Sequence, residues 1–564
     1  MAQTLSKASP AGVTDTQPGA LPGAAEASLL ETLGARRVVP IIISLMLGML
    51  LAALDQTVVG TAMPRIVTQL GGANYTWVIT SYLLASTCTV PVIGKLSDMY
   101  GRKSFFIGGM VIFLLGSALC GTAQNMPQLV IYRGIQGLGA GALMPLALSY
   151  IGDIFPPAER GKWQGLFTAV FGISSIVGPL IGGAITDNWG WRWVFYVNMP
   201  VGAVALIVAA LVLPVATLRR QHTIDYLGAA LLVVWAVCLL LGFSLGGTEL
   251  AWNSWQIIAL FAVALVGLGT FLLVERRARE PIILPRLFKN DIFAISTFSM
   301  FLVAAGMFGA ITYLAPFVQL ILGQSATNSG IILTPMMGGF IVSSIVGGQL
   351  LSRTGRYKVL AIVGFVVGAI GMLLLSRMSP STTNADLVRN MIVTGLGIGL
   401  LMSLFTIVVQ NAFSRDMIGQ VTSSLTFFRS LGSSIGVAVL GAIVTNAYSS
   451  KVASSVPAAL APYVDASKLA NQTTASKAID VPAAIAHLGP QQFQVLALQL
   501  ATNVKDAFST SVTLAFAIGA CMLVLALVAT LFLREIPLTG RQPAARAASE
   551  ASEVAPETVP EVLV

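Results

Sequence analysis

The stretch GKLSDMYGRK at residues 94–103 returns as GQLLSRTGRY at residues 348–357, an offset of 254 residues. A second pair repeats at nearly the same offset, GLGAGALM at 137–144 and GLGIGLLM at 395–402. In each pair the second copy lies eight long apolar stretches after the first. The chain therefore contains two related halves of six apolar stretches, with two further stretches inserted between them. Such internally repeated membrane halves, with a site at their interface, are typical of secondary transporters.

The composition places most of the chain in a membrane. Of 564 residues, 55% are hydrophobic and 10% are charged, whereas soluble domains carry about 25% charged residues. Fourteen stretches are long enough to cross about 30 Å of hydrocarbon as helices. We expect an all-α polytopic membrane protein of two pseudo-symmetric six-helix bundles plus two inserted helices, with spans near 40–64, 75–95, 104–123, 128–150, 164–186, 193–214, 226–246, 256–275, 292–316, 328–351, 359–377, 387–410, 420–447 and 511–533.

The basic residues predict the orientation. Of 32 Lys and Arg residues, 22 fall on the side of the N-terminus and eight on the other side, which puts both termini in the cytoplasm. We attribute the net charge of +9 to this topology and not to nucleic-acid binding. The expected parts are a disordered cytoplasmic tail at 1–35, the N-terminal bundle at 36–214, the inserted helices with their loops at 215–290, the C-terminal bundle at 291–535, and a second disordered cytoplasmic tail at 536–564.

Within the C-terminal part, residues 448–509 form a long segment outside the membrane. Phe493, Leu496, Leu500, Val504 and Phe508 recur there at helical spacing. We expect a surface loop, and the alternative is an amphipathic helix that lies over the outer mouth as a lid or exit guide.

Asp55 is the only carboxylate deep inside an apolar stretch. An ionisable group at membrane depth costs at least about 2.5–3.5 kcal/mol on insertion scales, so it indicates function by default. Proton binding and release by Asp55 is the functional interpretation, and a locked structural ion pair is the alternative. Arg133 lies at a depth that Asp55 could share, and it keeps its charge at any useful pH. It is a counter-ion to Asp55, a modulator of its protonation, or a structural contact to helix carbonyls.

The second half lacks these charges. The positions equivalent to Asp55 and Arg133 are Met307 and Met391, so proton chemistry is expected in the N-terminal half. Arg429 is the other buried charge, and it either attracts an anionic substrate or braces the C-terminal half. Helix packing is the favoured interpretation of the lining residues, and contact with a substrate is the alternative. The candidate residues of a substrate cavity are Phe171, Phe308, Tyr313, Gln319, Phe405, Gln410 and Arg429.

Two short motifs concern the movement of helices. In 94–103, Gly94 and Gly101 allow close packing and a turn, while Asp98 can accept hydrogen bonds from a helix N-terminus or from Arg102, as a latch on the cytoplasmic side. Lys103 completes the expected cytoplasmic gate. The alternative, a turn with positive-inside anchors, explains Lys95, Arg102 and Lys103 but leaves Asp98 unexplained. The second copy has Ser352 in place of Asp98, so the latch should be asymmetric. Close helix approach and a bend are expected in the fifth span from Gly178, Pro179, Gly182 and Gly183.

Five blocks together resemble the major facilitator superfamily, and within it the fourteen-helix drug:proton antiporters of the EmrB/QacA kind. In order, they are LDQTVVGTAMPRI (54–66), GKLSDMYGRK (94–103), YRGIQGLGAG (132–141), GISSIVGPLIGG (172–183) and WGWRWVFYVNMPVG (189–202). The resemblance implies that Asp55 is the proton-coupling acid, with Arg133 as its charged neighbour. It also implies that the fifth-span motif belongs to an antiporter, and that protons are used without any cofactor.

We therefore expect an exporter of amphipathic organic compounds, driven by the proton motive force and working by alternating access. It should act as a monomer in a bacterial inner membrane, in contact with lipid and without nucleic acid; the sequence does not decide whether a periplasmic adaptor is needed. The alternatives are export of an endogenous lipid, siderophore or antibiotic, a proton-coupled importer, and a membrane sensor. An enzyme is not expected, because His222 and His487 lie in loops and the four cysteines show no metal-ligand spacing.

Overall fold

The computed structural model describes residues 35–71, 76–214, 223–247, 249–321, 334–465 and 479–537. The two expected tails lie almost wholly outside these ranges. Fourteen helices of the described part are long and apolar enough to cross a membrane, in the order that the sequence predicts. The expected all-helical membrane fold is therefore confirmed.

Six spans form the N-terminal half, and a helical break divides the last of them into two pieces. Gly101, with a φ of 94°, separates the second span from the third, and the Asn125 side chain caps the fourth. The helices are α2 (Ala35–Leu70), α3 (Thr76–Tyr100), α4 (Arg102–Thr122), α5 (Met126–Ile154), α6 (Pro157–Asn188), α7 (Trp193–Tyr196) and α8 (Asn198–Val212).

The inserted hairpin and the C-terminal half follow. The hairpin consists of α9 (Tyr226–Leu245) and α10 (Trp255–Arg277). The C-terminal spans are α11 (Asp291–Leu320), α13 (Thr334–Thr354), α14 (Tyr357–Ser376), α15 (Asn384–Asn411), α16 (Ile418–Ser455) and α19 (Pro490–Leu531). Short helices are η1 (Pro285–Lys289), η2 (Arg415–Met417), η3 (Ala461–Tyr463) and α18 (Val481–Leu488).

The repeated glycine motif allows the same close contact between two helices in both halves. A Cβ on Gly139 of α5 would overlap the backbone of α4 at Gly109 and Phe113. A Cβ on Gly397 of α15, at the equivalent position, would overlap the backbone of α14 at Gly368. Small residues allow helix backbones to approach this closely. The repeat therefore fixes one equivalent helix pair in each bundle.

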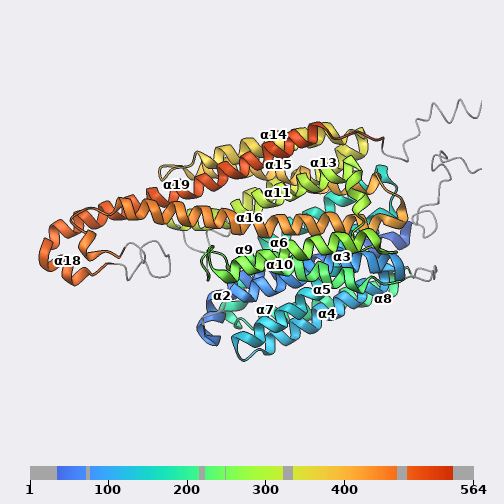
Figure 1. Ribbon diagram of the computed structural model, residues 1–564, viewed down its shortest axis with the longest axis horizontal. Helices are drawn as coiled ribbons and strands as arrows, with labels where there is room; N and C mark the ends of the chain where they lie inside the picture. The colour runs from blue at the N-terminus through green and yellow to red at the C-terminus, as the bar shows by residue number, and fades with distance from the viewer. Residues whose placement is uncertain are drawn as a thin grey trace, which may run out of the picture.

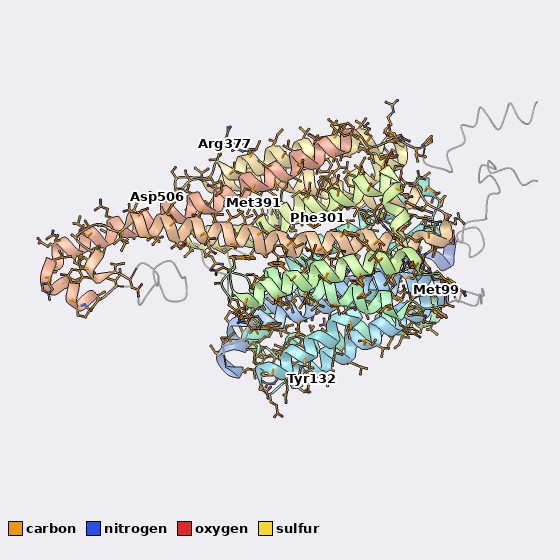
Figure 2. All side chains as sticks on the ribbon, in the orientation of Figure 1. Met99, Tyr132, Phe301, Arg377, Met391 and Asp506 are labelled. Atoms are coloured by element: carbon orange, nitrogen blue, oxygen red, sulfur yellow. The ribbon has the colours of Figure 1, made fainter. Side chains whose placement is uncertain are left out.

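Figure 1 shows the arrangement of the two halves. The N-terminal helices (blue to cyan) and the C-terminal helices (yellow to red) form two bundles, and α9 and α10 (green) lie along their junction. An aromatic contact fastens the insert there, since Trp235 of α9 meets Phe427 of α16 with ring centroids 5.8 Å apart. We call the end of the molecule at which α3 joins α4 the Gly101 end. Figure 2 labels Met99 at this end and Asp506 at the opposite end. We call the opposite end the arm end, because the extensions of α16 and α19 project from it.

Residues 448–509 differ from the expected surface loop. The described part is helical: α16 continues to Ser455, α18 follows, and α19 begins at Pro490 and runs without a break into the last span. Phe508 packs on Tyr448 with ring centroids 5.5 Å apart. Phe508 thus packs α19 against α16, and Nδ2 of Asn503 donates to the carbonyl of Ser455, the last residue of α16, at 2.8 Å. The pair projects from the bundle as an arm, as Figure 1 shows, and does not lie across it as a lid.

Candidate functional site

Asp55 and Arg133 form a buried ion pair between α2 and α5. Asp55 is 1% exposed and Arg133 is 2% exposed. Nη1 of Arg133 lies 2.5 Å from Oδ2 of Asp55. The other carboxylate oxygen accepts hydrogen bonds from Nε2 of Gln136 at 2.9 Å and from Nδ2 of Asn198 at 3.2 Å. Both oxygens of the buried acid are therefore satisfied, as a charge held away from water requires.

Neighbouring groups hold the Arg133 guanidinium in a fixed orientation. Its Nε donates to the carbonyl of Val78 at 3.3 Å, and its Nη1 donates to Oε1 of Gln136 at 2.8 Å. The Tyr82 ring lies under the guanidinium, 4.1 Å from its carbon atom to the ring centroid. Arg133 thus links α2, α3 and α5, and a change in the charge of Asp55 would be felt by all three helices.

Gln136 and Asn198 are ligands of Asp55 that were not predicted from the sequence. Gln136 lies one helical turn after Arg133, so helical spacing alone could have placed it beside the same partner. Asn198 lies at the start of α8 and also donates to Ser117 of α4 at 3.1 Å. Uncharged polar residues are common in membrane helices, and nothing in the sequence marks these two as ligands of Asp55.

A cavity of about 730 Å³ lies between the two halves. It reaches from Leu148 and Gln164 toward the arm end as far as Thr80 and Thr445. Arg133 forms part of its wall, whereas Asp55 lies directly behind that wall. Phe171 of α6 joins the halves across the cavity, with ring centroids 6.4 Å from Phe308 and 6.5 Å from Phe340. The candidate residues that the structure brings to this cavity are Phe171, Phe308, Tyr313 and Arg429.

Three other cavity candidates lie elsewhere. Gln319 is exposed near the arm end of α11 and is not part of the cavity wall. Phe405 is buried within the C-terminal half, with its ring centroid 5.9 Å from that of Phe365. Gln410 is buried near the Gly101 end, where its Nε2 donates to the carbonyl of Leu148 at 3.2 Å. Gln410 therefore joins the two halves at that end.

The halves are fastened together at the Gly101 end. Oδ2 of Asp98 accepts the backbone N–H of Gln420, in the first turn of α16, at 2.7 Å. Arg102 lies 3.0 Å from Oδ1 of Asp98 and 2.9 Å from Oδ2 of Asp153. A Cβ on Gly94 would overlap Ser423 of α16. Asp98 thus has both partners that the sequence suggested, and α3 lies directly against α16.

The second copy of the motif makes a different contact. Gly348 of α13 lies against Gly161 of α6, and a Cβ on either residue would overlap the backbone of the other. Oγ of Ser344 donates to the carbonyl of Gly165 at 3.1 Å. Ser352 contributes no carboxylate here. The cavity is therefore closed at the Gly101 end by the Asp98–Gln420 hydrogen bond, by the close backbone contact of Gly348 with Gly161, and by Gln410, which donates to Leu148 and accepts from Arg160 at 3.4 Å.

The fifth-span motif lies against α2 near Asp55. Cβ atoms on Gly178 and Gly182 would overlap Thr57 and Thr61, whereas one on Gly183 would meet open space. Oγ1 of Thr57 donates to the carbonyl of Ser174 at 3.1 Å. Two of the three glycines are thus required for the approach of α6 to the helix that carries Asp55.

Comparison with known proteins places this architecture. The model of the Major Facilitator Superfamily matches residues 45–437. The chain belongs to the major facilitator superfamily. Multidrug transporter protein MdtP of Bacillus subtilis (strain 168) is 46% identical over 430 residues, covering 75% of this chain and 78% of that protein. Multidrug resistance protein 3 of the same organism is 40% identical over 494 residues, covering 87% of this chain and 94% of that protein.

Solved structures agree on the major facilitator fold. The human organic anion transporter MFSD10 aligns with a TM-score of 0.57 and 12% identity, over 87% of this chain and 99% of that protein. The proton:xylose symporter XylE aligns with a TM-score of 0.56 and 16% identity, over 89% and 98%. The family model and the two Bacillus relatives show that this chain is a membrane transporter of the major facilitator type and not an enzyme.

The inserted hairpin of this major facilitator transporter reaches the closed end. Nε2 of Gln420 donates to the carbonyls of Pro281 and Ile282 at 2.8 and 2.7 Å, and Lys95 lies 3.3 Å from Glu280. Residues 278–284, which we call the strap, thus bind both α3 and α16. The internal repeat could not predict this contact, because the strap has no counterpart in the other half.

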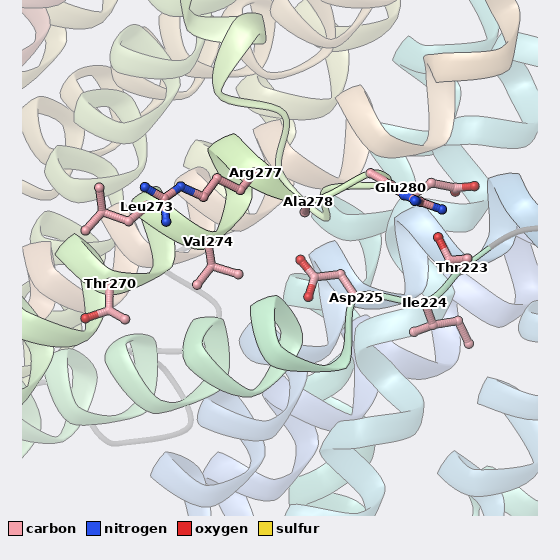
Figure 3. A pocket seen from close by; sticks show the side chains of 10 residues that line it. Thr223, Ile224, Asp225, Thr270, Leu273, Val274, Arg277, Ala278 and Glu280 are labelled. Carbon is pink, nitrogen blue, oxygen red and sulfur yellow. The ribbon is translucent and has the colours of Figure 1, made fainter.

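A second pocket of about 440 Å³ lies between the strap and the inserted helices, as Figure 3 shows. Asp225 caps α9 by accepting the N–H of Gly228 at 2.8 Å, and Glu280 pairs with Lys95. In Figure 3 the Arg277 side chain runs along α10 toward Leu273. The acidic groups of this pocket already serve the fold and the closed end.

Proposed function

We propose that this transporter exports amphipathic organic compounds across a bacterial cell membrane in exchange for protons. The observation that carries the proposal is the buried Asp55, which is paired with a cavity-wall arginine beside a cavity shared by both halves. The names of the two Bacillus relatives, a multidrug transporter and a multidrug resistance protein, support efflux as the direction.

We assign to Asp55 the role of binding and releasing the exchanged proton. When it accepts a proton, the Arg133 guanidinium loses its counter-charge while it stays buried. An uncompensated buried charge is strongly unfavourable, so the surrounding helices are driven toward an arrangement in which Arg133 finds water or another partner. Protonation is thereby linked to the relative position of α2, α3 and α5.

Because the Gly101 end is closed, we assign the described arrangement to the stage of the transport cycle in which the cytoplasmic side of the cavity is shut. With the termini in the cytoplasm, the arm end faces outward, and the cavity is closed on the cytoplasmic side. Proton uptake by Asp55 from outside resets the carrier, and substrate then binds from inside while Asp55 releases its proton. Opening the inner side requires the Asp98–Gln420 bond to break.

The proton gradient can drive this exchange. Each proton that enters yields about 2.3 kcal/mol per 100 mV of membrane potential and about 1.4 kcal/mol per unit of pH difference. Since Asp55 is the one carboxylate assigned to the exchange, one proton per cycle is the expected stoichiometry.

Proton flux in everted membrane vesicles tests the proposal. An imposed pH gradient is followed while ethidium or 1-pyrenebutyrate is added to vesicles with wild-type protein, Asp55→Asn or Asp386→Asn. Asp386 is a surface carboxylate paired with Arg389 at 3.1 Å, so it serves as the matched control. We expect substrate-evoked proton efflux in the wild type and the control, and none in Asp55→Asn. An unchanged response in Asp55→Asn, or no response in a folded wild type, would contradict the proposal.

A further inference from the structure

Arg429 of α16 lies half-buried in the cavity wall without an acidic partner. Its hydrogen bond is from Nη2 to the sulfur of Met144, 3.1 Å away. A thioether is a weak acceptor and carries no charge. No Asp or Glu of the described residues is paired with this guanidinium, and an arginine cannot discharge itself by losing its proton.

The remainder of the wall does not balance this charge. The described residues that line the cavity include no Asp and no Glu, and their only charged members are Arg133 and Arg429. Arg133 is neutralised by Asp55 behind the wall. One positive charge is therefore presented to whatever occupies the cavity, in surroundings where water screens it poorly.

Hydroxyl groups flank Arg429 on the cavity face of α16. Thr426, Ser430, Ser433 and Ser434 all line the cavity. They are one to five residues from Arg429, which places them within about one and a half helical turns. The hydroxyls of Thr426 and Ser433 already donate to the backbone carbonyls of Thr422 and Ser430 at 2.8 Å each. The guanidinium together with the hydroxyls of Ser430 and Ser434 is the donor set that can bind a carboxylate or sulfonate through charge-assisted hydrogen bonds. The same cavity offers an apolar surface at the aromatic cluster of Phe171, Phe308 and Phe340.

We propose that the cavity selects amphipathic organic anions, with the acidic group on Arg429 and the aromatic body against Phe171 and Phe308. This deepens the proposed export function, on which its direction of transport rests. Arg429 contacts Met144, which lies eleven residues after Arg133 on α5, so the backbone positions of Met144 and Arg133 are about 16 Å apart along the helix axis. The anion site and the proton site are therefore separate, and they communicate through helix movement and not through direct charge competition.

Binding to the purified full-length protein in lipid nanodiscs tests the selectivity. The probes share one aromatic body: 1-pyrenebutyrate, its neutral carboxamide, and a pyrenebutyl-trimethylammonium ion. For the wild type we expect the carboxylate to bind at least about tenfold more tightly than the carboxamide, because the carboxamide cannot form the charge-assisted hydrogen bond. The preference for the carboxylate over the cation should be larger still. Tighter binding of the cation would overturn the inference without any variant being needed.

Variants of Arg429 test whether this residue causes the preference for the carboxylate. Arg429→Gln should bind the carboxylate and the carboxamide equally, and Arg429→Lys should keep most of the preference. Arg377→Gln is the matched control, because Arg377 is exposed near the arm end of α14. An Arg429→Gln protein that folds and keeps the preference for the carboxylate would overturn the assignment. Asp55→Asn separates the two proposals: the carboxylate preference should survive in it, so a loss of proton coupling in that variant concerns the exchange alone.

Discussion

The backbone amide of Gln420 donates a hydrogen bond of 2.7 Å to Oδ2 of Asp98, so a carboxylate of one half caps the first turn of a helix of the other half. A negative charge at a helix N-terminus is stabilised both by the free N–H groups and by the helix dipole. The bond can exist only while α3 and α16 touch. Asp98 therefore stabilises the arrangement that is closed at the Gly101 end.

Asp98→Asn should weaken that closure. A charged hydrogen bond contributes about 1.5–3 kcal/mol, so we expect the ratio of closed to open molecules to fall by about ten- to a hundredfold. In a background without the four native cysteines, the measurement is the rate at which a membrane-impermeant maleimide labels Thr168→Cys from the Gly101 side. Labelling should accelerate with Asp98→Asn and stay unchanged with the surface control Asp386→Asn; equal rates in both would contradict the role given to Asp98.

Gln420→Ala should release the strap. The amide of Gln420 donates to two carbonyls of the strap, and the variant leaves them without this donor. Such a loss costs about 1–3 kcal/mol. We expect a lower thermal unfolding temperature in detergent and faster proteolysis of the strap, with Gln492→Ala on the exposed arm as the comparison. A strap that stays protected in Gln420→Ala would show that Lys95 and Glu280 suffice.

The glycines of the fifth span should differ in their tolerance of a methyl group. Gly178→Ala places a Cβ against Thr57, whereas Gly183→Ala meets open space. Overpacking costs about 1–3 kcal/mol, so Gly178→Ala should lower stability and Gly183→Ala should be neutral or slightly stabilising. Thermal unfolding of the two purified variants makes the comparison, and equal losses would contradict the packing of α6 on α2.

Asp55 and Arg133 should be strongly coupled in stability. Arg133→Gln or Asp55→Asn alone leaves one charge buried without its partner, which costs about 3–5 kcal/mol. The double variant removes both charges and should be less destabilised than the sum of the single variants, with a coupling of about 1–3 kcal/mol. Unfolding midpoints of the four proteins measure this cycle, and additive effects would mean that the pair is not energetically linked.

The sequence predicted the spans, their order and the depth of Asp55 and Arg133, because apolar length and isolated charges are strong signals in a membrane. It could not predict which face of a buried helix meets the cavity. In α15 nearly every residue from Gly397 to Gln410 is buried, so Phe405 could not be distinguished from a cavity residue by pattern. The arm shows a related limit. The helical spacing of its apolar residues was visible, but not that α16 continues to Ser455 and packs on α19 through Tyr448 and Phe508.

The hydrogen-bond partners of Asp55 could not be predicted from the sequence for a similar reason. Gln136 and Asn198 reach the carboxylate from α5 and α8, and only the packing of these helices on α2 brings them there. Gln420 likewise acts through the strap, which lies more than 130 residues before it in the chain. Contacts of this kind depend on tertiary geometry that no local pattern contains.

The most direct test is to count protons released when substrate binds to the purified protein. A pH indicator in weakly buffered detergent solution follows the addition of pH-matched 1-pyrenebutyrate or ethidium to wild-type protein and to Asp55→Asn. Since substrate and proton must each lower the affinity for the other, the account predicts release of about one proton per substrate from the wild type. It predicts none from Asp55→Asn. The same release from both proteins would contradict the assignment of the exchanged proton to Asp55.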